Sequence, residues 1–252
     1  AIMAGKLGGK TAITTGSMFD NAANLDPTFQ QAMLSAYHGT RLGAQELHGA
    51  LLDAVEGALW DPLMIDATRW LPGRDGPVPP LQRIVVGVDP SGSDGGDECG
   101  IVVVGLAAED DGGTWLNGAQ VRAPARHVYV LADYSVRRRP EVWGPAVVKA
   151  YRDWSANAVI AETNFGAALV VDVLHLLDSS MPIKRVTASR GKIARAEPAA
   201  LVYDQGRAHH VGYYSQLEVQ QATWDPAVDK YSPDRMDALV WAMADLLPDS
   251  VA

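Results

Sequence analysis

The sequence predicts an α/β protein built on one mixed sheet, with an antiparallel meander at its start and parallel strands after it. Two observations indicate this fold. Three strand-like segments follow one another directly, at about 83–89, 100–107 and 126–135. Helical and strand-like segments then alternate toward the C-terminus, a pattern typical of a sheet covered by helices. A mostly helical N-terminal segment precedes the sheet.

The first 80 residues differ in composition and hydrophobic pattern from the rest of the chain. Ala and Leu recur with helical periodicity from about Pro27 to Leu59, and Asp26 and Pro27 suit the N-cap and first helical position. The following stretch LPGRDGPVPP, 71–80, carries four prolines and two glycines. Neither a helix nor a central strand tolerates that composition. We interpret it as a linker, which divides the chain into residues 1–80 and 81–252.

The second part contains the predicted sheet and its helices. The turn-rich segment EDDGGTWLNG joins the second and third strands. His209 and His210 follow Gly206 in a further strand-like stretch, and we interpret both as structural. After the meander we expect strands at 157–162 and 183–187, and helices at about 140–155, 165–178, 194–205 and 233–247.

Composition and charge limit the classes of function. A net charge of -9 and a pI near 5.1 argue against a general nucleic-acid coat, which is normally basic. The single cysteine, Cys99, excludes an intramolecular disulfide framework. No apolar run approaches the roughly 20 residues of a membrane span, and no secretion signal is recognisable, so we expect a cytoplasmic protein. One segment is locally basic, with five cations and no acid: Lys184, Arg185, Arg190, Lys192 and Arg195.

Two acidic residues stand where predicted strands end. Asp89 closes the apolar run IVVGVD and precedes Pro90, which cannot continue the hydrogen bonding of a strand. Glu162 closes NAVIAE, a run typical of a buried parallel strand. Open α/β sheets bind ligands at the carboxyl ends of their strands. The two carboxylates therefore predict one shared site.

Further acidic residues come from the last predicted helix and from the loop after Asp89. Asp234 and Asp237 lie three residues apart, so both face one side of the helix while its apolar side packs. Asp237, one turn inside the helix, is the better ligand candidate, whereas an acid at the position of Asp234 also stabilises a helix N-terminus by about 0.3–1 kcal/mol. Asp94 and Asp97 are either accessory ligands or part of a solvated acidic turn.

Three carboxylates in one cleft repel one another unless cations neutralise them. Oxygen ligands without a His or Cys partner favour Mg²⁺ or Mn²⁺. Two such ions about 3.5–4 Å apart can activate a water and hold the leaving oxygen during in-line phosphodiester cleavage. The pattern therefore predicts a two-metal site at Asp89, Glu162 and Asp237, with Asp94, Asp97 and Asp234 as candidate accessory ligands.

Four segments in this order resemble one known family. VVGVDPSGSDGGDECGIVVVG, VIAETNFGAALVVDVL, VTASRGKIARAEPAALVYDQGRAHHVG and YSPDRMDALVWAMADL are similar to the C-terminal nuclease domain of the large terminase subunit. That subunit belongs to the DNA-packaging motor of tailed phages and gene transfer agents. Upstream, TTGSMFDNAANL and GTRLGAQELHGALLDAVEGALW resemble the tail of the family's ATPase domain and its connecting helical segment.

The resemblance implies a ribonuclease H-like fold in which Asp89, Glu162 and Asp237 match the acidic triad that binds two divalent ions. It implies cleavage of concatemeric double-stranded DNA in the host cytoplasm, with little sequence preference. It also implies that the basic segment guides the DNA backbone, through contacts that are salt-sensitive and sequence-blind. The implied partners are double-stranded DNA, the portal protein, the small terminase subunit and an upstream ATPase domain of the same polypeptide, with no membrane.

Other interpretations remain open. AGKLGGKT, at residues 4–11, fits a loosened phosphate-loop pattern, but it lacks the preceding strand and the following helix, so we expect no ATPase activity from this chain. A resolvase or transposase could share the fold and the metals while acting on another DNA geometry. A non-catalytic DNA- or partner-binding module would carry the acids only as surface charge.

Overall fold

The computed structural model describes residues 57–90, 98–112, 114–116, 119–122, 125–137, 140–163, 167–187, 191–229 and 233–251. Residues 53–252 form one compact unit, and residues 1–52, a second unit, lie outside the described part of the chain. The helix predicted over 27–59 is therefore described only at its last three positions, which are not helical. In the described ranges no helix is both long and apolar enough to cross a bilayer.

The sheet has the predicted mixed topology. Its strands lie in the order β8-β7-β1-β2-β5-β9, and β6 also pairs with β2. The meander β1–β2–β5 is antiparallel, whereas β7 and β8 extend it in parallel from β1 and β9 pairs in parallel with β5. The strands are β1 Leu81–Pro90, β2 Glu98–Asp110, β5 Arg126–Asp133, β6 Val136–Arg137, β7 Ala158–Glu162, β8 Ile183–Val186 and β9 Ala208–His210.

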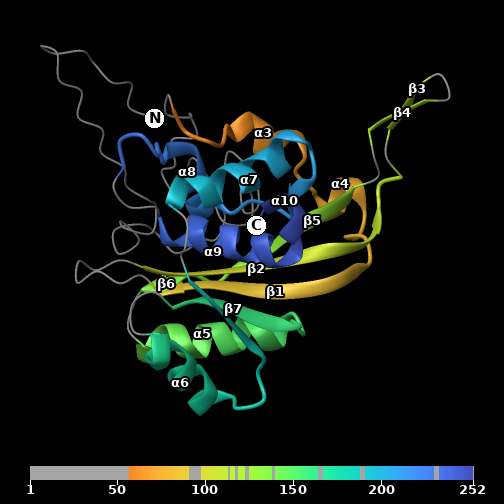
Figure 1. Cartoon of the computed structure of the whole chain (residues 1–252). Helices are drawn as coiled ribbons and strands as arrows, with labels where there is room; N and C mark the ends of the chain where they lie inside the picture. Colours follow the sequence, from red (N-terminus) through yellow and green to blue (C-terminus); the bar gives the residue numbers. More distant parts are fainter. Residues whose placement is uncertain are drawn as a thin grey trace, which may run out of the picture. The chain divides into compact units, whose positions relative to one another are not determined.

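Helices cover both faces of this sheet (Figure 1). Because successive side chains of a strand point to opposite faces, each strand contributes to two cores. Val85, Val102 and Ile160 pack with α7 (Lys192–Asp204), α8 (Ser215–Thr223) and α9 (Asp234–Leu246). Val86 and Val103 pack on the other face with α5 (Pro140–Asp153) and α6 (Ala167–Leu177). The carboxyl ends of β1 and β7 thus lie beside α9.

Several elements differ from the prediction. The turn-rich segment before β5 contains a small hairpin, β3 (Thr114–Leu116) with β4 (Ala119–Arg122), and α8 was not predicted. The proline-rich stretch begins with a short helix, α4 (Pro72–Asp75), because a proline at the first helical position loses no hydrogen bond. The same rule starts α3 (Pro62–Ala67), where Asp61 accepts a hydrogen bond from the Leu63 amide at 2.7 Å. A last helix, α10, spans Pro248–Val251.

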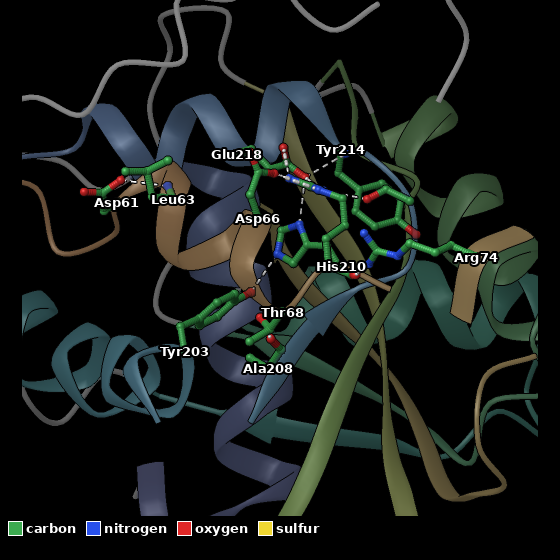
Figure 2. A network of polar contacts seen from close by, with 12 residues as sticks. Asp61, Leu63, Asp66, Thr68, Arg74, Tyr203, Ala208, His210, Tyr214 and Glu218 are labelled. Atoms are coloured by element: carbon green, nitrogen blue, oxygen red, sulfur yellow. Dashed lines mark hydrogen bonds and ion pairs between the residues drawn. The ribbon is translucent and has the colours of Figure 1, made fainter. Parts of the chain in front are cut away.

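Residues 57–80 pack against the sheet unit. Trp60 is fully buried, and Ile65 of α3 lies in the same core as α7 and α9. The guanidinium of Arg69 binds both carboxylate oxygens of Glu218 on α8, at 2.6 and 3.0 Å. Glu218 in turn accepts a hydrogen bond from Nδ1 of His210 (Figure 2). This buried network joins α3, β9 and α8.

Both histidines of β9 have structural contacts, as the sequence suggested. His210 accepts at Nε2 from the Tyr203 hydroxyl, 2.8 Å away, while its Nδ1 donates to Glu218 (Figure 2). His209 donates from Nδ1 to the carbonyl of Thr68 at 2.7 Å. Burial lowers the pKa of His210, and burial lowers that of His209 to about 4. Both rings are therefore neutral at pH 7.

Candidate active site

Three carboxylates converge at one edge of the sheet. Asp89 lies at the end of β1, Glu162 is the last residue of β7, and Asp237 lies in the first turn of α9. One carboxylate oxygen from each lies within 4.8 Å of the other two. The strand alternation explains this, because Asp89 shares a face with Val85, and Glu162 shares it with Ile160. That is the face covered by α9.

Glycines let α9 approach the strands closely enough for Asp237 to join the other two acids. A Cβ on Gly87 would lie 2.0 Å from the carbonyl oxygen of Ala238, and one on Gly100 would lie 2.0 Å from that of Asp234. Neither distance is possible for a real side chain, so the helix backbone rests directly on β1 and β2. Gly100 is also the β2 partner of Asp89.

The negative charges of the carboxylates repel one another in the absence of a cation. Burial raises the pKa of the Asp89 carboxyl well above its ordinary value, and the negative charges of Asp237, Glu162 and Asp234 add to the effect. The ammonium of Lys192 acts in the opposite direction. Hard oxygen donors, mutual repulsion and burial together fit a divalent cation such as Mg²⁺ or Mn²⁺.

Two cations of α7 lie beside Asp237. Nζ of Lys192 is 3.8 Å from Oδ2, and Nη2 of Arg195 is 3.9 Å from Oδ1. The side chain of Lys192 is 39% exposed, whereas that of Arg195 is only 10% exposed. Lys192 therefore reaches both the carboxylates and the solvent, while Arg195 is enclosed by the protein.

The other basic residues of the segment lie farther from the triad. Lys184 pairs with Asp245 at 2.7 Å, eight residues along α9 from Asp237, which corresponds to about 12 Å of helix. Arg185 is exposed. Residues two apart on a strand share a face, so Arg185 lies on the same side of β8 as Ile183, which packs on the face of α5 and α6. Arg190 lies outside the described residues.

The accessory acids are placed only in part. Asp94 and Asp97 fall in 91–97, outside the described residues. Asp234 begins α9 and raises the pKa of Asp89, but the group of three convergent carboxylates does not include it. Glu98 binds Arg235 at 2.7 Å, and Arg235 also donates to Asp133 at 2.7 Å.

Sequence reasoning missed two residues of α9 that bind carboxylates, one of which belongs to the triad residue Glu162. Trp241 donates from Nε1 to Oε2 of Glu162 at 2.8 Å. Arg235 is buried between Glu98 and Asp133, at the start of β2 and the end of β5. A tryptophan one helical turn after Asp237 was a visible signal for the first of these residues. No local pattern indicated the second, because its partners lie on distant strands.

No protein-family model and no curated protein sequence matches this chain. Among solved structures, the large terminase of a thermophilic bacteriophage aligns with 92% of this chain and 54% of its own, at 15% identity and a TM-score of 0.51. The large terminase nuclease of the thermophilic phage G20c aligns with 72% of this chain and 95% of its own, at 13% identity and a TM-score of 0.46. Thermus thermophilus RuvC covers 66% of this chain and 94% of its own, at 15% identity and a TM-score of 0.37.

The described part of this chain shares its fold with part of a phage large terminase. The chain spans about half the length of that structure, 54%. The large-terminase likeness and the sheet order together confirm the predicted ribonuclease H-like class, an antiparallel meander continued by parallel strands with helices on both faces. In this large-terminase fold the three carboxylates occupy the carboxyl ends of two neighbouring strands and the helix that crosses them.

Proposed function

We propose that this chain is a large-terminase nuclease, a metal-dependent endonuclease that cleaves double-stranded DNA during viral-type genome packaging. The observation that carries the proposal is the convergence of Asp89, Glu162 and Asp237 within 4.8 Å. The proposed cofactors are two Mg²⁺ or Mn²⁺ ions, which Asp89, Glu162 and Asp237 would hold. Asp94, Asp97 and Asp234 are proposed as accessory ligands.

The residues of the chain would divide the work between them. When bound, divalent ions supply the positive charge that phosphodiester hydrolysis needs at the attacking water and at the leaving oxygen. Asp89 and Glu162 would hold the ions from the ends of two strands, and Asp237 would complete the site from α9. Lys192, partly exposed beside Asp237, is placed to bind a phosphate oxygen at the edge of the site. These contacts would read the DNA backbone and not its sequence.

The basic segment provides the proposed track for DNA. Lys184, Arg185, Arg190 and Lys192 are its proposed phosphate contacts, whereas the enclosed Arg195 would act from within the protein beside Asp237. Phosphate contacts weaken as salt concentration rises. The net charge of -9 makes the chain a weak DNA binder on its own, so delivery of DNA by the packaging motor would govern cutting. The portal protein, the small terminase subunit and an ATPase domain upstream in the same polypeptide are the proposed partners, in the host cytoplasm.

Plasmid cleavage tests the proposal. Supercoiled plasmid is incubated with the purified chain in Mn²⁺, Mg²⁺ or EDTA, beside Asp89→Ala and the control Asp172→Ala, which changes an exposed acid of α6. We expect nicked and linear products with either metal, none in EDTA and none from Asp89→Ala. Cutting by Asp89→Ala at the wild-type rate would refute the site. A strong preference for four-way junctions over linear duplex would favour a resolvase.

A further inference from the structure

Trp241 holds one of the three carboxylates by a single directed hydrogen bond. Its indole Nε1–H donates to Oε2 of Glu162 at 2.8 Å, from α9 across to the end of β7. An indole N–H can only donate and never accept. One oxygen of Glu162 is therefore fixed by an uncharged donor, which leaves its negative charge in place for a cation.

Trp241 is itself held against the triad. It lies four residues after Asp237, on the same side of α9, because residues four apart are neighbours on a helix. The guanidinium of Arg195 lies over its ring, 4.7 Å from the ring centroid, and also 3.9 Å from Oδ1 of Asp237. A cation over an indole face is attracted by the negative face of the ring. Arg195 therefore contacts both Asp237 and the residue that orients Glu162.

The enclosure of these side chains favours a positioning role over a role in binding substrate. Trp241 is 8% exposed and Arg195 is 9% exposed, so neither presents much surface to DNA. Lys192, one turn before Arg195 in α7, is the exposed cation of the pair. In metal sites, the groups that hydrogen-bond to ligands fix the orientation of those ligands, and losing one typically weakens metal binding or activity about 10–100-fold.

We propose that Trp241 is a positioning residue of the metal site, which orients Glu162 through its indole N–H and is held in place by Arg195. This inference rests on the proposed metal-dependent nuclease function. It adds a residue that touches neither the metal nor the DNA. Its consequence is that removal of one N–H group, with the aromatic ring kept, weakens divalent metal binding.

The test is Mn²⁺ binding by the full chain, followed by the electron paramagnetic resonance of free Mn²⁺. Trp241→Phe is compared with wild type and with Trp60→Phe. Trp60 is a matched control because it is fully buried and, in the part of the chain that the structure describes, its Nε1 has no hydrogen-bond partner. We expect Trp241→Phe to weaken Mn²⁺ binding about tenfold and Trp60→Phe to leave it within about twofold. Equal affinities for the two variants would overturn the proposal.

A second replacement removes the effect of lost volume. β-(3-Benzothienyl)alanine at position 241 substitutes sulfur for the indole N–H at nearly the same shape, so it folds even where a phenylalanine leaves too large a cavity. The same tenfold loss is expected, and wild-type affinity would overturn the role of the N–H. Plasmid cutting should then need about ten times more Mn²⁺ for half-maximal rate, at an unchanged KM for DNA.

The outcomes separate this inference from the function on which it rests. A wild-type chain that binds Mn²⁺ but cuts no DNA refutes the nuclease, and the affinity ratio still decides the role of Trp241. A wild-type chain that cuts DNA while both position-241 variants bind Mn²⁺ normally refutes the positioning role alone. A wild-type chain that binds no Mn²⁺ overturns both.

Discussion

The carboxylate of Asp89 is buried among negative charges, a setting that opposes folding when no cation is present. Its raised pKa means that the folded state disfavours the ionised form, so above the ordinary pKa of an aspartate the group costs stability. Asn is nearly isosteric and uncharged. We therefore predict that Asp89→Asn raises the unfolding temperature in EDTA by about 2–4 °C, equivalent to about 1 kcal/mol in a chain of this size.

The same substitution should remove stabilisation by metal. Wild type is expected to gain unfolding temperature as Mn²⁺ is added, because a ligand that binds only the folded state stabilises it. Asp89→Asn is expected to gain little, and both effects are read by differential scanning calorimetry with and without Mn²⁺. Asp172→Asn on the exposed side of α6 serves as the control and should behave as wild type. A lower unfolding temperature for Asp89→Asn in EDTA would contradict the account.

His209 makes stability depend on pH in a different range. Burial lowers its pKa to about 4, against about 6.5 in an unfolded chain. Between these values the unfolded state binds more protons, so stability falls as pH falls from about 6.5 to about 4, by up to about 3 kcal/mol. His209→Asn keeps a donor for the Thr68 carbonyl without an ionisable ring. Urea unfolding across this range should show a flatter pH dependence for that variant.

The exposed His175 of α6 provides the matched control for this effect. His175→Asn should keep the wild-type pH dependence, because it changes an exposed side chain and leaves the buried His209 in place. An unchanged slope in His209→Asn would mean that another group dominates the acid sensitivity. His210, also buried and with a lowered pKa, would then be the next residue to replace.

At the scale of elements, the contact between α9 and the strands decides where Asp237 lies. Gly87→Ala would place a methyl group 2.0 Å from the carbonyl oxygen of Ala238, so the helix must move away from β1. Overpacking of this kind costs typically about 1–3 kcal/mol. We therefore predict that Gly87→Ala lowers the stability by this amount, measured by urea unfolding. The variant should also bind Mn²⁺ more weakly, measured from the concentration of free Mn²⁺. Gly73→Ala in α4, where a Cβ meets nothing within 4 Å, should change neither.

The elements that sequence predicted are those with a strong local signal. Apolar runs predicted β1, β2 and β7. Asp89 and Glu162, which close two of these runs, and Asp237 in an amphipathic helix predicted the triad. The hairpin β3–β4 was missed because its glycines and asparagine resemble those of an ordinary turn. Trp241 was missed as a partner of Glu162, although it lies one helical turn after Asp237, because an aromatic ring in an apolar helix more often takes part in core packing. A contact between side chains on elements far apart in the sequence leaves no local pattern by which it could be predicted.

At the scale of the whole molecule, residues 57–80 behave as part of the sheet unit. The predicted division of the chain at residue 80 would remove Trp60 and Ile65 from the core, each contributing about 1.5–3 kcal/mol by burial. It would also remove Arg69 from Glu218. Burial raises the pKa of Glu218, but the hydrogen bonds from His210 and Arg69 and the positive charge of Arg69 outweigh it and bring that pKa to about 2.

We predict that a fragment of residues 81–252 fails to fold cooperatively, whereas residues 53–252 unfold in one transition. Breaking a buried ion pair costs about 3–5 kcal/mol, and with the lost burial the total approaches the 5–15 kcal/mol that stabilises a typical domain. Circular dichroism during heating and urea titration of both fragments measures this. A stable 81–252 fragment would contradict this prediction, because it would show that the core folds without residues 57–80. In that case Arg69→Met in the longer fragment should cost less than about 1 kcal/mol, the value for an exposed ion pair.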